Sequence, residues 1–242
     1  MDYEDIIRRW QKQPINDVAD VDLKLHNFRI LFAYHSGKIE NEQIDYHNTR
    51  EIFENGRVSN YTGDIRTLFE QKNQKDCYEM LKLPIVIKQP VSIELIKKIH
   101  FELTKGSYDE SRFAKGERPG EFKKHDYVVG YLDVGSDAEN VETDLINLIE
   151  EINDYDGNKF LKVAAYLHAN FENIHPFADE NGRVGRTLMN YFLIINNHPP
   201  VIIYEEDRKE YYKALEAFDE AEELEPLVSF LTNQCIKTWR KK

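Results

Sequence analysis

Cysteine is scarce in this chain of 242 residues, which contains only Cys77 and Cys235. The two lie far apart and form no C-x-x-C motif, which excludes a disulfide framework and a cysteine-based zinc site. No apolar run approaches the roughly 20 residues that a membrane-spanning helix needs. The first residues, MDYEDIIRRWQ, lack the apolar segment of a signal peptide. We therefore expect a cytoplasmic protein.

Positive charge is also in short supply. The chain has 32 Lys and Arg against 44 Asp and Glu, which gives a formal net charge of −12. Non-specific binding to nucleic acid or to an anionic membrane needs a cationic surface, so neither partner is expected. A bound nucleotide would have to find a local cluster of basic residues.

Glycine and proline are few as well, with 11 and 8 residues, which disfavours a fold of many short strands and turns. The hydrophobic fraction of 41% is sufficient for a packed core and argues against wholesale disorder. No internal repeat or low-complexity linker is present. These features predict one all-α bundle.

Apolar residues recur at helical spacing along most of the chain. A helix from Ile65 is expected to end before Pro84, because proline cannot continue a helix. Ser92 is a candidate N-cap for the next one. The only credible β element is Tyr127–Leu132, which has the β-branched and aromatic residues of a short strand or hairpin arm. Further helices are predicted at Val141–Ile152, Phe160–Ile174, Gly185–Ile195, Tyr211–Phe218 and Pro226–Trp239.

The segment HPFADENGRVGR, residues 175–186, places polar residues between two strongly apolar helices. Pro176 ends the first helix, and Asn181-Gly182 offers a tight turn before the second. A loop that leads into a helix N-terminus exposes unpaired backbone N–H groups at the positive end of the helix dipole. Such a loop is a candidate anion site.

The side chains of this segment suit phosphate chemistry. Arg183 and Arg186 share one helix face and can donate charge-assisted hydrogen bonds. Asp179 is a hard oxygen ligand of the kind that Mg²⁺ takes beside phosphates. His175 can serve as a general base near pH 7. The alternative is a plain helix connector in which these residues only cap helices and form ion pairs.

The same segment closely resembles HPFx(D/E)GNGRxxR, the signature of Fic-domain proteins. These are all-helical enzymes that most often transfer AMP from ATP to a protein hydroxyl. The resemblance implies a Fic fold with a β-hairpin flap, ATP as co-substrate, and Mg²⁺ or Mn²⁺ as cofactor. It also implies a protein target with a Ser, Thr or Tyr hydroxyl, self-modification, and a possible homodimer.

The resemblance also implies roles for individual residues. His175 would deprotonate the hydroxyl, Asp179 would hold the metal, and Phe177 would anchor the loop in the core. Arg183 would reach the β-phosphate and Arg186 the γ-phosphate. The implied ATP-binding set is Asp179, Glu180, Asn181, Gly182, Arg183, Gly185, Arg186 and Tyr211.

Glu180 departs from the signature, which has glycine at this position. Glycine permits a positive φ and close approach of the backbone to phosphate. If the Glu180 carboxylate faces solvent the anion site survives; if it faces inward, ATP affinity or phosphate geometry suffers. Gly182 is retained, which favours AMP transfer over the family's phosphate-transferring branch.

The segment Ser36-Gly37-Lys38-Ile39-Glu40-Asn41 resembles the family's inhibitory motif (S/T)xxxE(G/N). The resemblance implies an N-terminal inhibitory helix, of the class II type, in residues 1–50, and a Fic core in residues 51–242. Glu40 would pair with Arg186 and displace the γ-phosphate, and Ser36 would share its helix face. Without the resemblance, Glu40 would be interpreted as an ordinary surface residue.

Two further parts resemble the family less strongly. The hairpin around Val128, Val129, Gly130 and Tyr131 resembles the flap that docks the target by strand addition. Tyr211 resembles the tyrosine that faces adenine, and its alternative interpretation is a core tyrosine. The leading hypothesis is thus a magnesium-dependent protein adenylyltransferase. Transfer of another group, such as UMP or phosphocholine, and a catalytically impaired nucleotide-binding regulator remain open.

Overall fold

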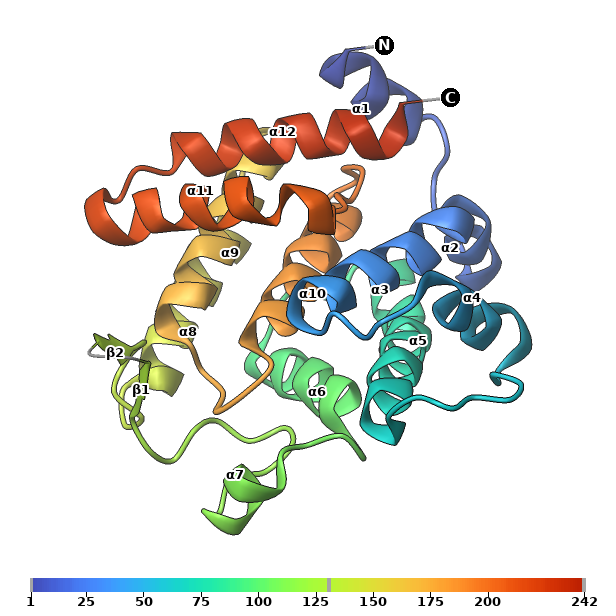
Figure 1. Cartoon of the computed structure of the whole chain (residues 1–242). Coiled ribbons are helices and arrows are strands. Elements are labelled where there is room, and N and C mark those ends of the chain that lie inside the picture. Colours follow the sequence, from blue (N-terminus) through green and yellow to red (C-terminus); the bar gives the residue numbers. More distant parts are fainter. Residues whose placement is uncertain (1, 130–131, 241–242) are drawn as a thin grey trace.

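The computed structural model describes residues 2–129 and 132–240 and shows a helical bundle with one hairpin (Figure 1). This confirms the all-α prediction. The helices are α1 (Tyr3–Gln11), α2 (Val18–Lys24), α3 (His26–Glu40), α4 (Tyr46–Asn55), α5 (Ile65–Val86), α6 (Ile93–Thr104), α7 (Glu110–Ala114), α8 (Val141–Asn153), α9 (Phe160–Ile174), α10 (Asn181–Ile195), the 3-10 helix η1 (Glu205–Asp207), α11 (Arg208–Ala221) and α12 (Glu225–Trp239).

Many of these helices begin at an acidic or hydroxyl side chain that accepts a hydrogen bond from the first turn. Ser92 caps α6 in this way, as expected, through the backbone N–H of Leu95. Asp2, Asp17, Asp45, Asp64 and Asp109 cap α1, α2, α4, α5 and α7. Helix α10 lacks such a cap, which leaves its first backbone N–H groups unpaired by a side chain.

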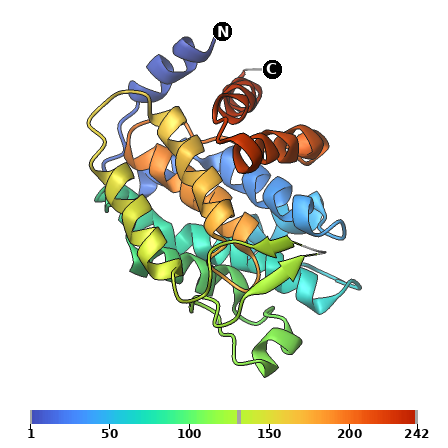
Figure 2. The same cartoon turned by 90° about the vertical axis from the view of Figure 1, so that its left-hand side faces the viewer.

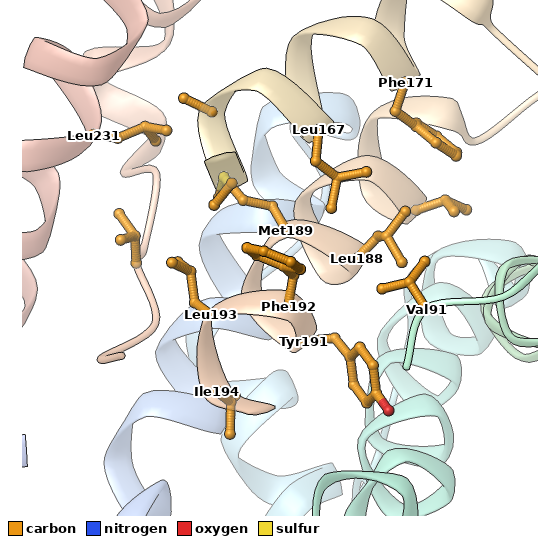
Figure 3. Close-up of a cluster of buried hydrophobic side chains, with 14 of the residues drawn as sticks. Val91, Leu167, Phe171, Leu188, Met189, Tyr191, Phe192, Leu193, Ile194 and Leu231 are labelled. Carbon is orange, nitrogen blue, oxygen red and sulfur yellow. The ribbon is translucent and has the colours of Figure 1, made fainter. Parts of the chain in front are cut away.

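The core is built around α9 and α10, which lie side by side at the centre of the bundle (Figure 1). Leu188, Met189, Phe192 and Leu193 of α10 are buried almost completely and pack against Leu167 and other apolar side chains of neighbouring helices (Figure 3). Because α10 is apolar nearly all round, it is covered on every side, and its polar first turn is held at a fixed place.

The hairpin consists of β1 (Tyr127–Val129) and β2 (Leu132–Val134), paired antiparallel with Tyr127 opposite Val134. The hairpin ends two residues beyond the predicted element, which stops at Leu132. Figure 2 shows the hairpin lying beside the end of α9. Gly130 and Tyr131, predicted to belong to the flap, lie outside the described residues.

Two local predictions were wrong. Helix α5 does not end before Pro84 but continues to Val86, although Pro84 has no N–H to donate to the carbonyl four residues back. The neighbouring Leu81 and Ile85 are buried in the core, which offsets the lost hydrogen bond. Asn181 and Gly182 do not form a turn, because both belong to the first turn of α10. The chain reverses instead one residue earlier, at Glu180, which has the left-handed φ of 68°.

Among the residues that the structure describes, no helix combines the length and the apolar character that crossing a lipid bilayer requires.

Candidate functional site

A cavity of about 550 Å³ opens where the loop between α9 and α10 meets α3, α5, α7 and α11. Its volume lies in the usual range for small-molecule sites. The predicted residues that line it are Glu40, His175, Asp179, Glu180, Asn181, Gly182, Arg183, Arg186 and Tyr211. Gly185 does not line the cavity and instead faces α9, where an added Cβ would lie 2.7 Å from Glu172 Oε1.

Hydrogen bonds and ring stacking hold the loop between α9 and α10 in place. The Asn181 side chain is buried, and it accepts a hydrogen bond from the Phe177 N–H at 2.9 Å and donates to the Phe177 carbonyl at 2.7 Å. The Phe177 ring is fully buried and stacks on His100, with ring centroids 3.8 Å apart. These contacts fix the direction in which the first turn of α10 points.

His175 terminates α9 in a left-handed conformation, with φ of 50°. Burial, together with the positive charge of Lys123, lowers the pKa of its imidazole to about 4. The ring is therefore neutral at pH 7 and able to accept a proton. The base of the hairpin lies against the residue before His175, since the Ser136 N–H donates to the Ile174 carbonyl at 2.9 Å.

Asp179 presents a partly exposed carboxylate to the cavity. Its Oδ1 accepts from the Glu180 N–H at 3.0 Å, while Oδ2 lies 3.8 Å from Arg66 Nη2 and 3.9 Å from Arg112 Nε. Neither arginine was predicted from the sequence, because both come from helices remote from the motif. The Asp179 side chain is 31% exposed and offers hard oxygen donors of the kind that Mg²⁺ takes beside phosphates, so the residue type fits the expected metal.

Arg186 is buried and is held by α3. Its Nη2 lies 2.7 Å from Glu40 Oε1, and its Nε donates to Ser36 Oγ at 3.0 Å. The neighbouring carboxylates of Glu40 and Glu172 raise the pKa of this guanidinium despite its burial. A Cβ on Gly182 would lie 2.6 Å from Glu40 Oε1, so a side chain at this position would displace the Glu40 carboxylate from its present place.

Arg183 is enclosed by two carboxylates. Glu180 turns its side chain inward and forms an ion pair with Arg183 Nη2, while Glu70 Oε2 lies 3.6 Å from Nη1. Burial raises the pKa of the Glu180 carboxyl to about 7. Of the two orientations considered for Glu180, the inward one is found.

Glu70 is a site residue that sequence reasoning missed. It lies on α5, is only 4% exposed, and accepts a hydrogen bond from Asn41 Nδ2 at 2.8 Å. This contact ties the end of α3 to the cavity wall. No local pattern around Glu70 distinguishes it from the other charged residues of α5.

The two tyrosines of α11 differ in exposure. Tyr211 is 1% exposed, and its hydroxyl lies 2.7 Å from Nε2 of the buried His168. Tyr212 is 46% exposed and also lines the cavity. The predicted residue Tyr211 thus forms the wall, while the neighbouring ring, which was not predicted, is the one available to a ligand.

Comparison with known proteins gives one consistent result. The profile of the Fic/DOC family matches residues 90–193. The protein adenylyltransferase Fic of Aedes aegypti is 28% identical over 240 residues, which are 94% of this chain and 45% of that protein. That of Drosophila mojavensis is 29% identical over 216 residues, 85% of this chain and 39% of that protein. The chain spans less than half the length of these curated relatives.

Solved structures show the same fold. A Fic domain containing signaling protein from Bacteroides thetaiotaomicron superposes with a TM-score of 0.83 at 22% identity, over 98% of this chain and 93% of that one. Fic-1 from C. elegans, residues 134–508, gives a TM-score of 0.78 at 23% identity, over 98% and 67%. These structures confirm the Fic fold expected from the motif, and within that fold residues 90–193 match the Fic/DOC family.

Proposed function

We propose that this chain transfers AMP from ATP to a hydroxyl side chain of a protein, itself included. The observation that carries the proposal is one cavity in which the neutral imidazole, the metal-binding type of carboxylate and the two arginines of the motif converge with the uncapped N-terminus of α10. The relatives named protein adenylyltransferase Fic support the same activity.

His175 takes the proton of the target hydroxyl, whose oxygen forms a bond to the α-phosphorus of ATP. The bond from that phosphorus to the bridging oxygen breaks, and pyrophosphate leaves. The N–H groups at the start of α10, with Arg183 and Arg186, stabilise the charge on the phosphates. Asp179 would hold Mg²⁺, which neutralises part of that charge when bound.

The cavity walls supply places for the remaining parts of the substrates. Tyr212, whose ring is exposed, is the better surface for a nucleobase, with Tyr211 behind it. The β1–β2 hairpin, through Val128 and Val129, is a surface for strand addition by the target next to His175. The hydroxyl-bearing segment would then lie between the hairpin and the imidazole.

Glu40 is proposed to act as a brake. Its carboxylate neutralises Arg186, so a γ-phosphate would have to compete with a charge-assisted ion pair. We further propose that the reaction takes place in the cytoplasm, in agreement with the two buried, unpaired thiols of Cys77 and Cys235. A homodimer is compatible with this function.

A second candidate function is favoured by one observation. Because Glu180 forms an ion pair with Arg183, the site could bind a nucleotide without turning it over, as a regulator. Transfer of UMP or phosphocholine is a further enzymatic alternative, since the loop would contact the phosphates and not the base.

The test measures labelling of the full chain, alone and in lysate, with Mg²⁺ and ATP labelled at the α- or the γ-phosphate. Glu40→Gly is expected to raise α-label transfer about tenfold to a hundredfold, since a charge-assisted contact contributes about 1.5–3 kcal/mol. Adding His175→Ala should abolish transfer and leave ATP binding intact. Glu42→Gly is the matched control, because Glu42 is exposed and pairs with Arg208 outside the loop.

Transfer of the γ-label would show that the protein transfers phosphate and not AMP. ATP binding without transfer of label to any protein would favour the regulator. Stronger competition by UTP than by unlabelled ATP would favour UMP transfer.

A further inference from the structure

Glu180 has two energetically unfavourable features at the start of α10, one in its backbone and one in its side chain. Its backbone has φ of 68° and ψ of 13°, a region that residues with a Cβ seldom enter. Its carboxylate is only 7% exposed and turns back over its own helix to Arg183, which is 5% exposed. Such a conformation persists only where the surroundings hold it, which makes it a candidate functional feature.

The ion pair leaves polar atoms without partners. Among the described residues, Glu180 Oε2 and Arg183 Nε are buried and have no hydrogen-bond partner. Glu70 adds a second negative charge 3.6 Å from Arg183 Nη1. Arg183 is therefore neutralised but incompletely bonded, although a planar guanidinium can bind an anion through two parallel N–H groups.

The Arg186 guanidinium forms its ion pair with a carboxylate from a different element. Glu40, at the end of α3, contacts it at 2.7 Å, while Glu180 belongs to the loop itself. Each of the two arginines at the start of α10 thus has its own carboxylate. In contrast, no side chain caps the first turn of α10, where a first phosphate would bind.

We propose that Glu180 occupies the position of a second phosphate on Arg183, so that the site selects ligands by their number of phosphates. This rests on the proposed function, because it takes the cavity as a nucleotide site. One phosphate binds at the N-terminus of α10 with Glu180 in place. A second phosphate binds only after the carboxylate leaves Arg183.

The Glu180 carboxylate competes effectively with a phosphate for Arg183, because it is attached to the loop and does not have to bind from solution. A nucleoside diphosphate carries more charge, but its affinity is reduced by the work of separating Glu180 from Arg183. Nucleoside monophosphates avoid this loss. The expected signature is a selective gain for diphosphates when the carboxylate is removed.

The experiment is calorimetric titration of the full chain with AMP and with ADP, each with Mg²⁺. Glu180→Gly and Glu180→Gln are compared with the parent, and ADP affinity is expected to rise about tenfold to a hundredfold while AMP affinity changes less than threefold. Glu180→Gln keeps the Cβ and the backbone conformation, so it isolates the charge. Glu222→Gly is the matched control, because Glu222 is an exposed glutamate with a positive φ of 55°.

Equal gains for AMP and ADP, or an ADP gain as large in Glu222→Gly, would overturn the assignment of Glu180 to the second phosphate. Those results would leave the proposed function standing. Absence of binding for both nucleotides in every variant, with thermal unfolding like that of the parent, would overturn the proposed function and this inference together.

Discussion

Arg186 has a side chain only 2% exposed, so its charge depends on partners that the fold brings to it. Ser36 and Glu40 supply them from a helix about 150 positions earlier in the chain. A buried guanidinium without such partners would cost several kcal/mol. The neighbouring Glu172 shares this environment but has no ion pair with Arg186, and its Oε1 has no hydrogen-bond partner among the described residues.

Burial raises the pKa of the Glu172 carboxyl to about 7, above its ordinary value of 4.5. Between these two pH values the folded protein keeps a proton that the unfolded chain has lost. The free energy of unfolding therefore falls as the pH rises through this window. We expect Glu172→Gln to remove this part of the pH dependence, on the order of 2–3 kcal/mol.

The measurement is urea unfolding of the parent and of Glu172→Gln at pH 5 and pH 8. The buried Glu180 carboxyl shifts in the same direction, but it is present in both proteins and cancels in the comparison. An identical pH dependence in the two proteins would show that Glu172 is ionised in the folded state at neutral pH.

At the scale of secondary-structure elements, the hairpin and α9 meet through a glycine. Gly135 has φ of 84°, and a Cβ there would lie 2.4 Å from the Ile174 carbonyl oxygen and 2.5 Å from His175 Cβ. The strand pair can approach the imidazole only because this side chain is absent. Position 135 thus determines how closely the hairpin approaches the proposed base.

Gly135→Ala is expected to push the hairpin away from His175 and to reduce labelling of a target at least tenfold. The ATP dissociation constant should change less than twofold, because the nucleotide side of the cavity is untouched. Gly116→Ala is the control: its φ of 95° is equally unfavourable, but no atom lies within 4 Å of the added Cβ. Equal losses in both variants would point to backbone strain and not to the hairpin contact.

Over the whole molecule, residues 1–50 are not packed as a separate body. Ile6, Trp10, Leu25 and Phe28 belong to the same hydrophobic cluster as the central helices. Trp10 of α1 contacts Trp239 of α12, with ring centroids 5.2 Å apart, so the two ends of the described chain lie together (Figure 1). We propose that residues 1–50 and 51–242 form a single folding unit.

This proposal predicts one unfolding transition. Trp10 and Trp239 are the only tryptophans of the chain, so tryptophan fluorescence reports the contact between α1 and α12. In urea, the midpoint of the fluorescence change is expected to coincide with that of far-UV circular dichroism. Trp10→Ala should lower both midpoints and reduce the free energy of unfolding by about 3–5 kcal/mol. Loss of the fluorescence signal before the helices unfold would make residues 1–50 a separate unit.

The helices could largely be predicted from the sequence, because their periodicity and caps involve residues a few positions apart. Phe160–Ile174 was placed correctly at both ends. Pro84 was placed wrongly, since burial of the neighbouring Leu81 and Ile85 keeps the last turn helical despite the missing N–H. The reversal at Glu180 was missed because glutamate seldom adopts a positive φ and Asn-Gly is the commoner turn pair.

The proximity of His175, Asp179 and Arg183 was determined by the sequence alone, because they lie within nine residues of one loop and its helix. The pairing of Glu40 with Arg186 was suggested by resemblance to a family and not by any local pattern. Only the tertiary structure decided that Glu180 faces inward and that Glu70 completes the enclosure of Arg183. The Glu70 contact depends on how α5 and α10 pack. The inward direction of Glu180 depends on the left-handed backbone and the burial that the folded site imposes, and the residue types alone specify neither.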